Sequence, residues 1–465
     1  MVYGLAEELL LFKVMLLVIV NFNTGTLVAT IVATWVGGGF FSNAIIESYK
    51  EGLIFVVIFF ADFLSLLVIG LFFAPRLSEF LGKISIAEAM GELYGPKVRV
   101  ITAVTGFIGV SGIIAIQLQI AGHLFDYAFG LPLYYGIIIS GIIITLYSSL
   151  GGIQAVTFTD VIQFITFGIV IPSIALMLFK NLGSDAMLDT ISNHPKFDYK
   201  EVFSSSNPQI YYYSSVLLWF LIPGFNPGIF QRISMAKDID QVKSSFTISA
   251  FIQFSIALVL GWVGLLLLSE QSNLQENDIL KFIISDYHWV IGFKGIILAA
   301  IMAMIMSTVD SYINSNSILL VHDLKNALDL KFIKNELLGT RICAAIIGTV
   351  AILVALRGGN FFKLLLWTST CYMPIVTVPF IMSLFGFRST GRSVLAGMIA
   401  GFVTVVIWEL FLTEKLANVG SLIPAMLANL AFLLGYHYLF NQKGGWVGIK
   451  DPNVLVELRR QKKGR

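Results

Sequence analysis

Long apolar runs separated by short polar segments occupy almost the whole chain. A helix needs about 20 mostly apolar residues to cross a bilayer, and roughly thirteen runs meet this measure. They cover approximately residues 5–21, 26–45, 52–74, 100–126, 133–149, 156–179, 212–231, 245–268, 289–321, 338–356, 362–385, 393–412 and 420–440. The first run is weak because Glu7, Glu8 and Lys13 lie in or beside it. The pattern predicts an all-α polytopic membrane protein with about 12 to 13 transmembrane helices.

The composition supports this class. Hydrophobic residues make up 57% of the chain, charged residues only 12%, and the mean hydropathy is +0.85. A soluble domain carries about a quarter charged residues. We find no linker, and we therefore expect one membrane domain over residues 22–440, preceded by a short or truncated leading helix at 1–21 and followed by a basic tail at 441–465.

Several function classes have no support in the sequence. No phosphate-cradling glycine loop is present, so we do not expect an ATP-driven pump. The two cysteines cannot build a disulfide framework, and the five histidines show no metal-ligand spacing. We expect no enzyme activity, no organic cofactor, no nucleic-acid partner and no obligate protein partner.

The positions of lysine and arginine indicate the orientation. Basic residues follow the third, seventh, ninth and eleventh runs, whereas the segment 269–285 is net acidic. The residues in question are Arg76, Lys83, Lys97, Arg99, Arg232, Lys237, Lys243, Lys325, Lys331, Lys334, Arg341, Arg388 and Arg392. Because cytoplasmic loops carry an excess of positive charge, these loops and the basic tail are predicted to be cytoplasmic.

Two of the predicted helices contain a break. The second run holds three consecutive glycines at 37–39, and the seventh contains Pro223-Gly224-Phe225-Asn226-Pro227. Two prolines in one span remove backbone donors and force a kink. Broken backbone in lipid is tolerated only where protein or a water-filled cavity satisfies it. Breaks at corresponding positions, five spans apart, indicate an inverted-repeat transporter with its binding site near the midplane.

Buried polar residues mark a candidate ion site. The ninth run places Ser307, Ser311, Asn314 and Ser315 on one helix face, with Asp310 at its edge. An acid inside a span is costly unless it faces a polar interior, and hard cations prefer oxygen ligands. Two further acids lie in predicted spans. Asp62 is interpreted as functional or paired, and Asp160 either caps its helix or has a role with the ion.

Four segments resemble one transporter family. GGIQAVTFTDVIQ at 151–163 is similar to the G-G-x-x-A-V-x-x-T-D-x-x-Q segment of the sodium:solute symporter family. FQR at 230–232 with MAKD at 235–238 resembles its Q-R…A-K-D stretch, and MSTVDS at 306–311 its M-S-[ST]-x-x-S segment. ATWVGGG at 33–39 resembles the choline-transporter branch most. The resemblance covers roughly residues 22–440.

The resemblance implies a fold and a set of site residues. The fold would be a leucine-transporter-type inverted repeat of five plus five helices, formed by the second to eleventh runs. Sodium would bind to backbone oxygens of Ala33, Val36 and Met304 and to the hydroxyls of Ser307 and Thr308. Asp160 matches a family aspartate linked to cation coupling, and Asp310 is a second candidate. From their position near the breaks, we expect the solute to contact Trp35, Gly37, Trp219, Phe225 and Asn226.

The implied function is secondary transport. Sodium moving inward would drive uptake of a small organic solute, such as proline, or a pantothenate-like or choline-like molecule, by alternating access across a bacterial inner membrane. The sodium ion is co-transported, and the lipid bilayer is the other partner. Two alternatives remain open: a proton-coupled symporter, and the solute-sensing membrane module of a histidine kinase. The family's G-R segment before the first core helix is missing, which predicts impaired insertion or activity.

Overall fold

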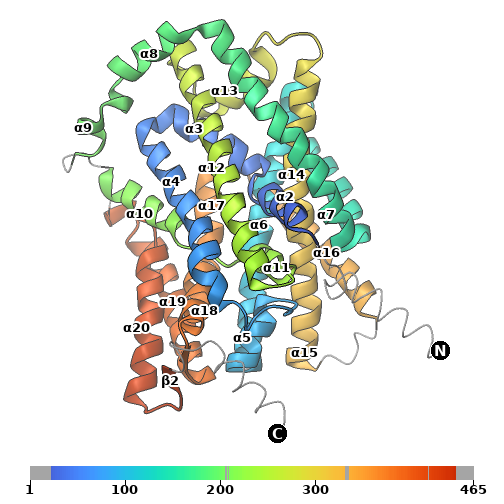
Figure 1. Ribbon diagram of the computed structural model, residues 1–465, viewed down its shortest axis with the longest axis vertical. Helices are drawn as coiled ribbons and strands as arrows, with labels where there is room; N and C mark the ends of the chain where they lie inside the picture. Colours follow the sequence, from blue (N-terminus) through green and yellow to red (C-terminus); the bar gives the residue numbers. More distant parts are fainter. Residues whose placement is uncertain (1–21, 205–206, 208, 330–334, 417, 447–465) are drawn as a thin grey trace.

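A computed structural model describes residues 22–446 of the chain, except 205–206, 208, 330–334 and 417. The predicted leading helix at 1–21 and residues 447–465 of the predicted tail lie outside the described part. Within it, the chain is almost entirely helical, with most helices side by side along the long axis of the molecule (Figure 1).

The first half of the chain contains the following elements: α2 (Thr24–Trp35), α3 (Gly38–Glu51), α4 (Leu53–Val68), η1 (Ile69–Phe73), η2 (Ala74–Arg76), α5 (Ile86–Tyr94), α6 (Pro96–Phe129), α7 (Leu133–Leu182), α8 (Ser184–Asn193), η3 (Pro195–Phe197), α9 (Tyr199–Val202), α10 (Ile210–Leu221) and α11 (Pro227–Ser234). The second half contains α12 (Ile239–Glu270), α13 (Glu276–Lys281), η4 (Phe282–Asp286), α14 (Phe293–Ile318), η5 (Leu319–Asp323), α15 (Leu324–Leu328), α16 (Glu336–Leu356), α17 (Phe361–Thr370), η6 (Met373–Thr377), α18 (Val378–Leu384), β1 (Phe387–Arg388), α19 (Gly391–Phe411), η7 (Glu414–Leu416), α20 (Leu422–Leu439) and β2 (Gly445–Trp446).

The described residues form 10 helices long and apolar enough to cross a membrane, or up to 11 if α2 and α3 count as one span bent by 58°. The helix α7 supplies two of the ten, because Gly152 (φ 68°) breaks it into Leu133–Leu150 and Ala155–Leu182. The predicted run 212–231 is divided into the short helices α10 and α11. Each predicted run from 26–45 onward therefore corresponds to a span or to a broken pair.

Helices five spans apart pack against one another. The helix α4 contacts α12, α6 contacts α14, and α7 contacts α16. At another crossing of the two halves, Gly264 of α12 approaches α3 so closely that a Cβ atom would lie 2.7 Å from the carbonyl oxygen of Ile45. Small residues allow such contacts in membranes, where close packing rather than water exclusion holds helices together.

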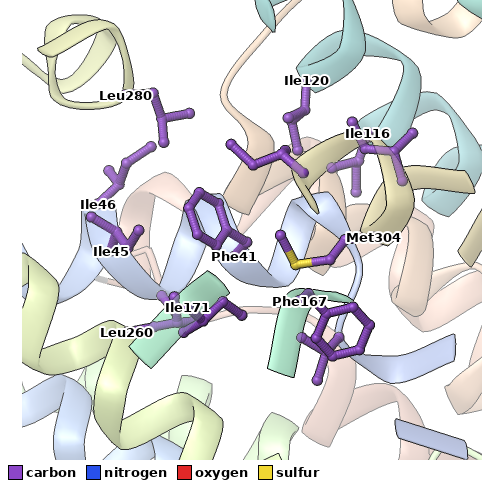
Figure 2. Close-up of a cluster of buried hydrophobic side chains, with 14 of the residues drawn as sticks. Phe41, Ile45, Ile46, Ile116, Ile120, Phe167, Ile171, Leu260, Leu280 and Met304 are labelled. Carbon is purple, nitrogen blue, oxygen red and sulfur yellow. The ribbon is translucent and has the colours of Figure 1, made fainter. Parts of the chain in front are cut away.

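A large apolar cluster joins α3 to its neighbours. Figure 2 shows side chains of α3, α6, α7, α12, α13 and α14 gathered in it: Phe41, Ile45, Ile46, Ile116, Ile120, Phe167, Ile171, Leu260, Leu280 and Met304. Because α3 follows the glycine break directly, this packing fixes the direction in which the chain leaves the break. The cluster therefore positions the backbone around residues 36–39.

Different elements lie at the two ends of the bundle. The helices α5 and α15 and the β1–β2 pair lie at one end, and α8, α9 and α13 at the other (Figure 1). At the first end, Arg99 forms an ion pair of 2.6 Å with the buried Asp323. The second end carries Glu276 of α13, which is 3.1 Å from Lys50.

Candidate functional site

The break between α2 and α3 is packed tightly against α14. Helix α2 ends at Trp35, and the next residue, Val36, has a ψ of 70°, which is not helical. A Cβ atom on Gly37 would lie 2.4 Å from Oγ1 of Thr308, and one on Gly38 would lie 2.5 Å from Cγ1 of Ile305. Gly37 and Gly38 are therefore required by the approach of α14 as well as by the bend.

Hydroxyls of α14 bind carbonyls of the broken helix. The Ser307 hydroxyl is 2.7 Å from the Ala33 carbonyl oxygen and 3.0 Å from that of Met304, and Thr308 donates to the Thr34 carbonyl at 3.3 Å. Both side chains are buried. The structure thus brings Ala33, Met304 and Ser307 together, with Thr308 beside them. Neutral oxygens converging from two helices are a donor set suited to a hard cation.

Asp160 lies in a second polar cluster beside α2. Its Oδ2 atom accepts a hydrogen bond from Thr30 and lies 3.5 Å from Nη2 of Arg232. Nη2 also contacts the hydroxyl of Ser311 at 2.5 Å, and that hydroxyl accepts a bond of 3.1 Å from Thr34. The cluster is connected to the Ser307 region through α2 and α14. The sequence pattern singled out Asp160 and Ser311 but not Thr30.

Two interpretations of the sequence are wrong at this cluster. Asp160 does not cap its helix, since it lies inside the span Ala155–Leu182 and is 0% exposed. Arg232 is not a loop residue, since it belongs to α11 and is 2% exposed. The sequence did contain a signal for the buried position of Arg232. Pro227 is typical of the first position of a helix, and the helix that begins there, α11, includes Arg232.

Asp310 lies on another side of α14. Its Oδ1 atom accepts a hydrogen bond from Ser148 in the first half of α7. Its Oδ2 atom is buried and has no hydrogen-bond partner among the described residues. Asp310 is therefore not among the residues that contact the Ala33 carbonyl, although it is close to them in sequence.

At the second break, between α10 and α11, side-chain hydroxyls donate hydrogen bonds to the free backbone carbonyls. Tyr372 donates to the Phe225 carbonyl at 3.0 Å, and Thr377 donates to that of Gly224 at 2.8 Å. Asn226 caps α11 by accepting a bond of 3.0 Å from the Ile229 amide. Phe225 has a φ of 44°, and its ring packs against Phe380 at 5.1 Å in the apolar core.

A cavity lies between the two breaks. Its volume is about 170 Å³. Of the predicted solute contacts, Trp35, Trp219 and Asn226 line the cavity, whereas Gly37 and Phe225 are not part of its lining. The lining also includes polar residues that the solute prediction did not include: Asn43, Asp62, Ser65, Gln117, Tyr312 and Ser369.

The two glutamines of α6 divide as their spacing requires. Gln117 faces the cavity and accepts a hydrogen bond of 3.0 Å from the Gly39 amide. Gln119 points elsewhere and donates to the Ala355 carbonyl at 3.1 Å.

The chain is similar to several sodium-coupled transporters. It is 23% identical over 396 residues to the sodium/glucose cotransporter of Vibrio parahaemolyticus, covering 76% of this chain and 71% of that protein. It is 24% identical over 400 residues to the human high affinity choline transporter 1, and the match covers 81% of this chain and 66% of that protein. It is 25% identical over 362 residues to the high-affinity proline transporter PutP of Bacillus subtilis, covering 73% and 74%.

Solved structures show the same fold. A substrate-bound, outward-open Na⁺-coupled sialic acid symporter superimposes with a TM-score of 0.75 at 18% identity, covering 89% of this chain and 90% of that one. MhsT in complex with L-phenylalanine gives a TM-score of 0.55 at 14% identity, covering 88% and 97%. These neighbours have the leucine-transporter fold, which confirms the predicted fold class.

The model of the sodium:solute symporter family matches residues 19–401, which is most of the chain. The resemblance inferred from the four sequence motifs is thereby confirmed. The chain belongs to the sodium:solute symporter family and is a multi-pass membrane protein, a sodium-coupled secondary transporter and not an enzyme.

Proposed function

We propose that this protein carries a small organic solute into the cell with a sodium ion bound by Ala33, Val36, Met304, Ser307 and Thr308. One observation carries the proposal: the Ser307 hydroxyl lies within hydrogen-bond distance of carbonyl oxygens from both α2 and α14. A hydroxyl has a single proton, so it cannot satisfy both carbonyls fully. A cation among these oxygens would bind all three at once.

The same contacts supply a coupling mechanism. A sodium ion drawing Ala33 and Ser307 together would fix the break of α2 against α14. Trp35, two residues after Ala33, lines the central cavity, so ordering the break also orders one wall of the solute site. Inward movement of the ion contributes about 2.3 kcal/mol per charge for each 100 mV of membrane potential.

Asp160 and Asp310 are proposed to take part in ion coupling. Asp160 reaches α2 through its hydrogen bond with Thr30, so a change at the first break is transmitted to the Asp160–Arg232 pair. The Oδ2 atom of Asp310 is buried and has no hydrogen-bond partner among the described residues, which favours a second candidate, in which a proton replaces sodium. A carboxyl group at that place can carry a proton without requiring a charged partner.

We further propose a bacterial inner membrane location with the carboxyl terminus in the cytoplasm. The support is that α5 and α15 lie at the same end of the bundle as β2 (Figure 1). Lys325 belongs to α15, and Lys83 and Arg99 lie in the segments on either side of α5. Positive residues concentrate in cytoplasmic loops.

The first experiment is solute uptake into proteoliposomes containing the full chain. Proline, pantothenate, choline and a sugar are each offered with an inward sodium gradient, with a proton gradient, or with neither. Sodium-driven accumulation of one solute above its equilibrium level is the expected result. Accumulation driven only by a proton gradient would favour the second candidate, in which a proton is the coupled ion. Binding of a solute without accumulation, in protein that remains folded, would contradict the symport proposal and favour a sensor.

A further inference from the structure

The central cavity holds one buried carboxylate, Asp62 of α4, which is 3% exposed. Its Oδ2 atom accepts hydrogen bonds from Nε1 of Trp35 at 3.3 Å and from Nε2 of Gln253 at 2.5 Å. Both donors are uncharged. Among the residues that the structure describes, no hydrogen bond to Oδ1 and no ion pair with Asp62 is present.

A carboxylate in this position needs a positive partner. Buried charges in proteins are paired or bind metals, and intramembrane acids that have no lasting partner mark binding sites. Asp62 is the one charged side chain among the described residues that line the cavity; no lysine, arginine or histidine is among them. A cation that enters the cavity would supply the missing counter-charge.

The walls around Asp62 suit a cation of organic size. The indole of Trp35 donates to Asp62 directly, and Trp219 and Phe220 line the same space. Aromatic faces attract ammonium groups, and the attraction is stronger in a site shielded from water. A solute carboxylate would instead meet the negative charge of Asp62 and would find no basic side chain in the described lining.

We propose that the solute of this transporter carries a net positive charge, in an ammonium group that pairs with Asp62. The inference rests on the proposed solute site between the two breaks and names the chemical class that this site selects. Asp62 then acts as the specificity-determining residue. Because Trp35 binds Asp62 and follows Ala33 and Thr34 in α2, the solute also contacts the segment that is proposed to hold sodium.

The test compares solutes that differ in charge and little in shape. The purified full chain is heated in sodium buffer with choline, ethanolamine or agmatine as cations, and the shift of the unfolding temperature is recorded. The isostere 3,3-dimethylbutan-1-ol replaces the nitrogen of choline with carbon, and glycine betaine adds a carboxylate. Proline and myo-inositol complete the set of solutes without a net positive charge. At least one of the cations is expected to raise the unfolding temperature more than any of these four solutes does. Equal or greater stabilisation by a neutral or zwitterionic solute, or none by any cation, would overturn the inference.

Two variants separate charge from structure. Asp62→Asn preserves the shape and an oxygen acceptor for Trp35, and it should weaken binding of the best cation at least about thirtyfold while leaving the neutral isostere unaffected. Gln253→Met removes a hydrogen bond to Asp62 but keeps its charge, so the preference for cations should persist. If Asp62→Asn does not fold, Asp62→Glu replaces it and should retain the preference. Unchanged cation affinity in Asp62→Asn would contradict the proposal.

The outcomes also separate this inference from the symport proposal. Sodium-driven uptake of a neutral or zwitterionic solute would leave symport standing and remove the role of Asp62. Selective binding of cations without sodium-driven accumulation would support the role of Asp62 and contradict the symport proposal.

Discussion

The two broken helices are both interrupted by glycine or proline residues, but their free carbonyls have different hydrogen-bond partners. At the first break, the hydroxyls of Ser307 and Thr308 reach carbonyls of α2, and the Ser307 hydroxyl also faces a carbonyl of its own helix. At the second, Tyr372 and Thr377 each satisfy one carbonyl of the 222–226 segment. The first break gathers several oxygens around one point, whereas the second distributes its oxygens among separate donors.

The difference teaches that unwinding a helix does not by itself make an ion site. Both breaks free backbone carbonyls, as any interruption of a membrane helix does. Only convergence of these carbonyls with other oxygens creates a cation site, and at the second break Phe225 and Phe380 occupy the surroundings instead. The second break is therefore interpreted as a wall of the solute cavity and the first as the ion site.

The largest expected effect concerns the residue that joins the two breaks. Arg232 lies on α11, after the second break, and pairs with Asp160, which is bonded to α2 before the first. Arg232→Met should lower the free energy of unfolding by about 3–5 kcal/mol, because it leaves a buried carboxylate without its partner. Denaturant unfolding in detergent measures the loss. The double variant with Asp160→Asn should recover part of it, and a simple sum of the two single losses would refute the pairing.

The next effect tests the convergence of oxygens at the first break. Ser307→Ala combined with Thr308→Ala should raise the sodium concentration for half-maximal uptake on the order of 100-fold, since changes in and around a metal site weaken affinity 10- to 100-fold. The matched control at the second break is Tyr372→Phe with Thr377→Val, which removes two hydroxyls without altering sodium dependence. Equal effects of the two double variants would show that the breaks are equivalent.

A smaller effect separates the two breaks by their packing. A Cβ atom on Gly37 would lie 2.4 Å from Thr308 Oγ1, whereas one on Gly224 would first meet Met373 Sδ at 3.5 Å. Gly37→Ala should therefore cost about 1–3 kcal/mol of stability and weaken sodium binding, because it overpacks the site. The added methyl group of Gly224→Ala would make only ordinary van der Waals contacts. This variant should therefore lose much less stability and much less sodium affinity than Gly37→Ala. Thermal unfolding with and without sodium distinguishes the two, and equal losses would contradict the difference in packing.

The smallest effect concerns one hydrogen bond of the second break. Thr377→Val removes the bond of 2.8 Å to the Gly224 carbonyl and should cost about 1 kcal/mol of stability. Sodium-dependent uptake should keep its half-saturation concentration, because this hydroxyl lies outside the proposed ion site. A changed sodium dependence in Thr377→Val would assign the second break a part in ion binding.

Much of this architecture could be predicted from the chain alone. Apolar runs located the spans, because a helix in lipid must be apolar over a fixed length. The glycines at 37–39 and the prolines at 223 and 227 located both breaks, because these residues act on their own backbone. The polar stripe of α14 also indicated Ser307, Ser311 and Asp310, since a polar residue in a span is itself a local signal.

Only the tertiary structure decided which of these groups meet. Ser307 and Ala33 are 274 residues apart, and Arg232 and Asp160 are 72 apart, so no local pattern relates them. Hydropathy also assigned Arg232 to a loop and could not distinguish Phe225 in the core from Trp219 in the cavity, because it records polarity and not direction. Helix packing sets direction, and packing depends on side chains contributed by every part of the chain. The sequence by itself thus determined the spans, the breaks and the family, whereas the oxygens that converge and the carboxylate that faces the cavity were decided by how the helices pack.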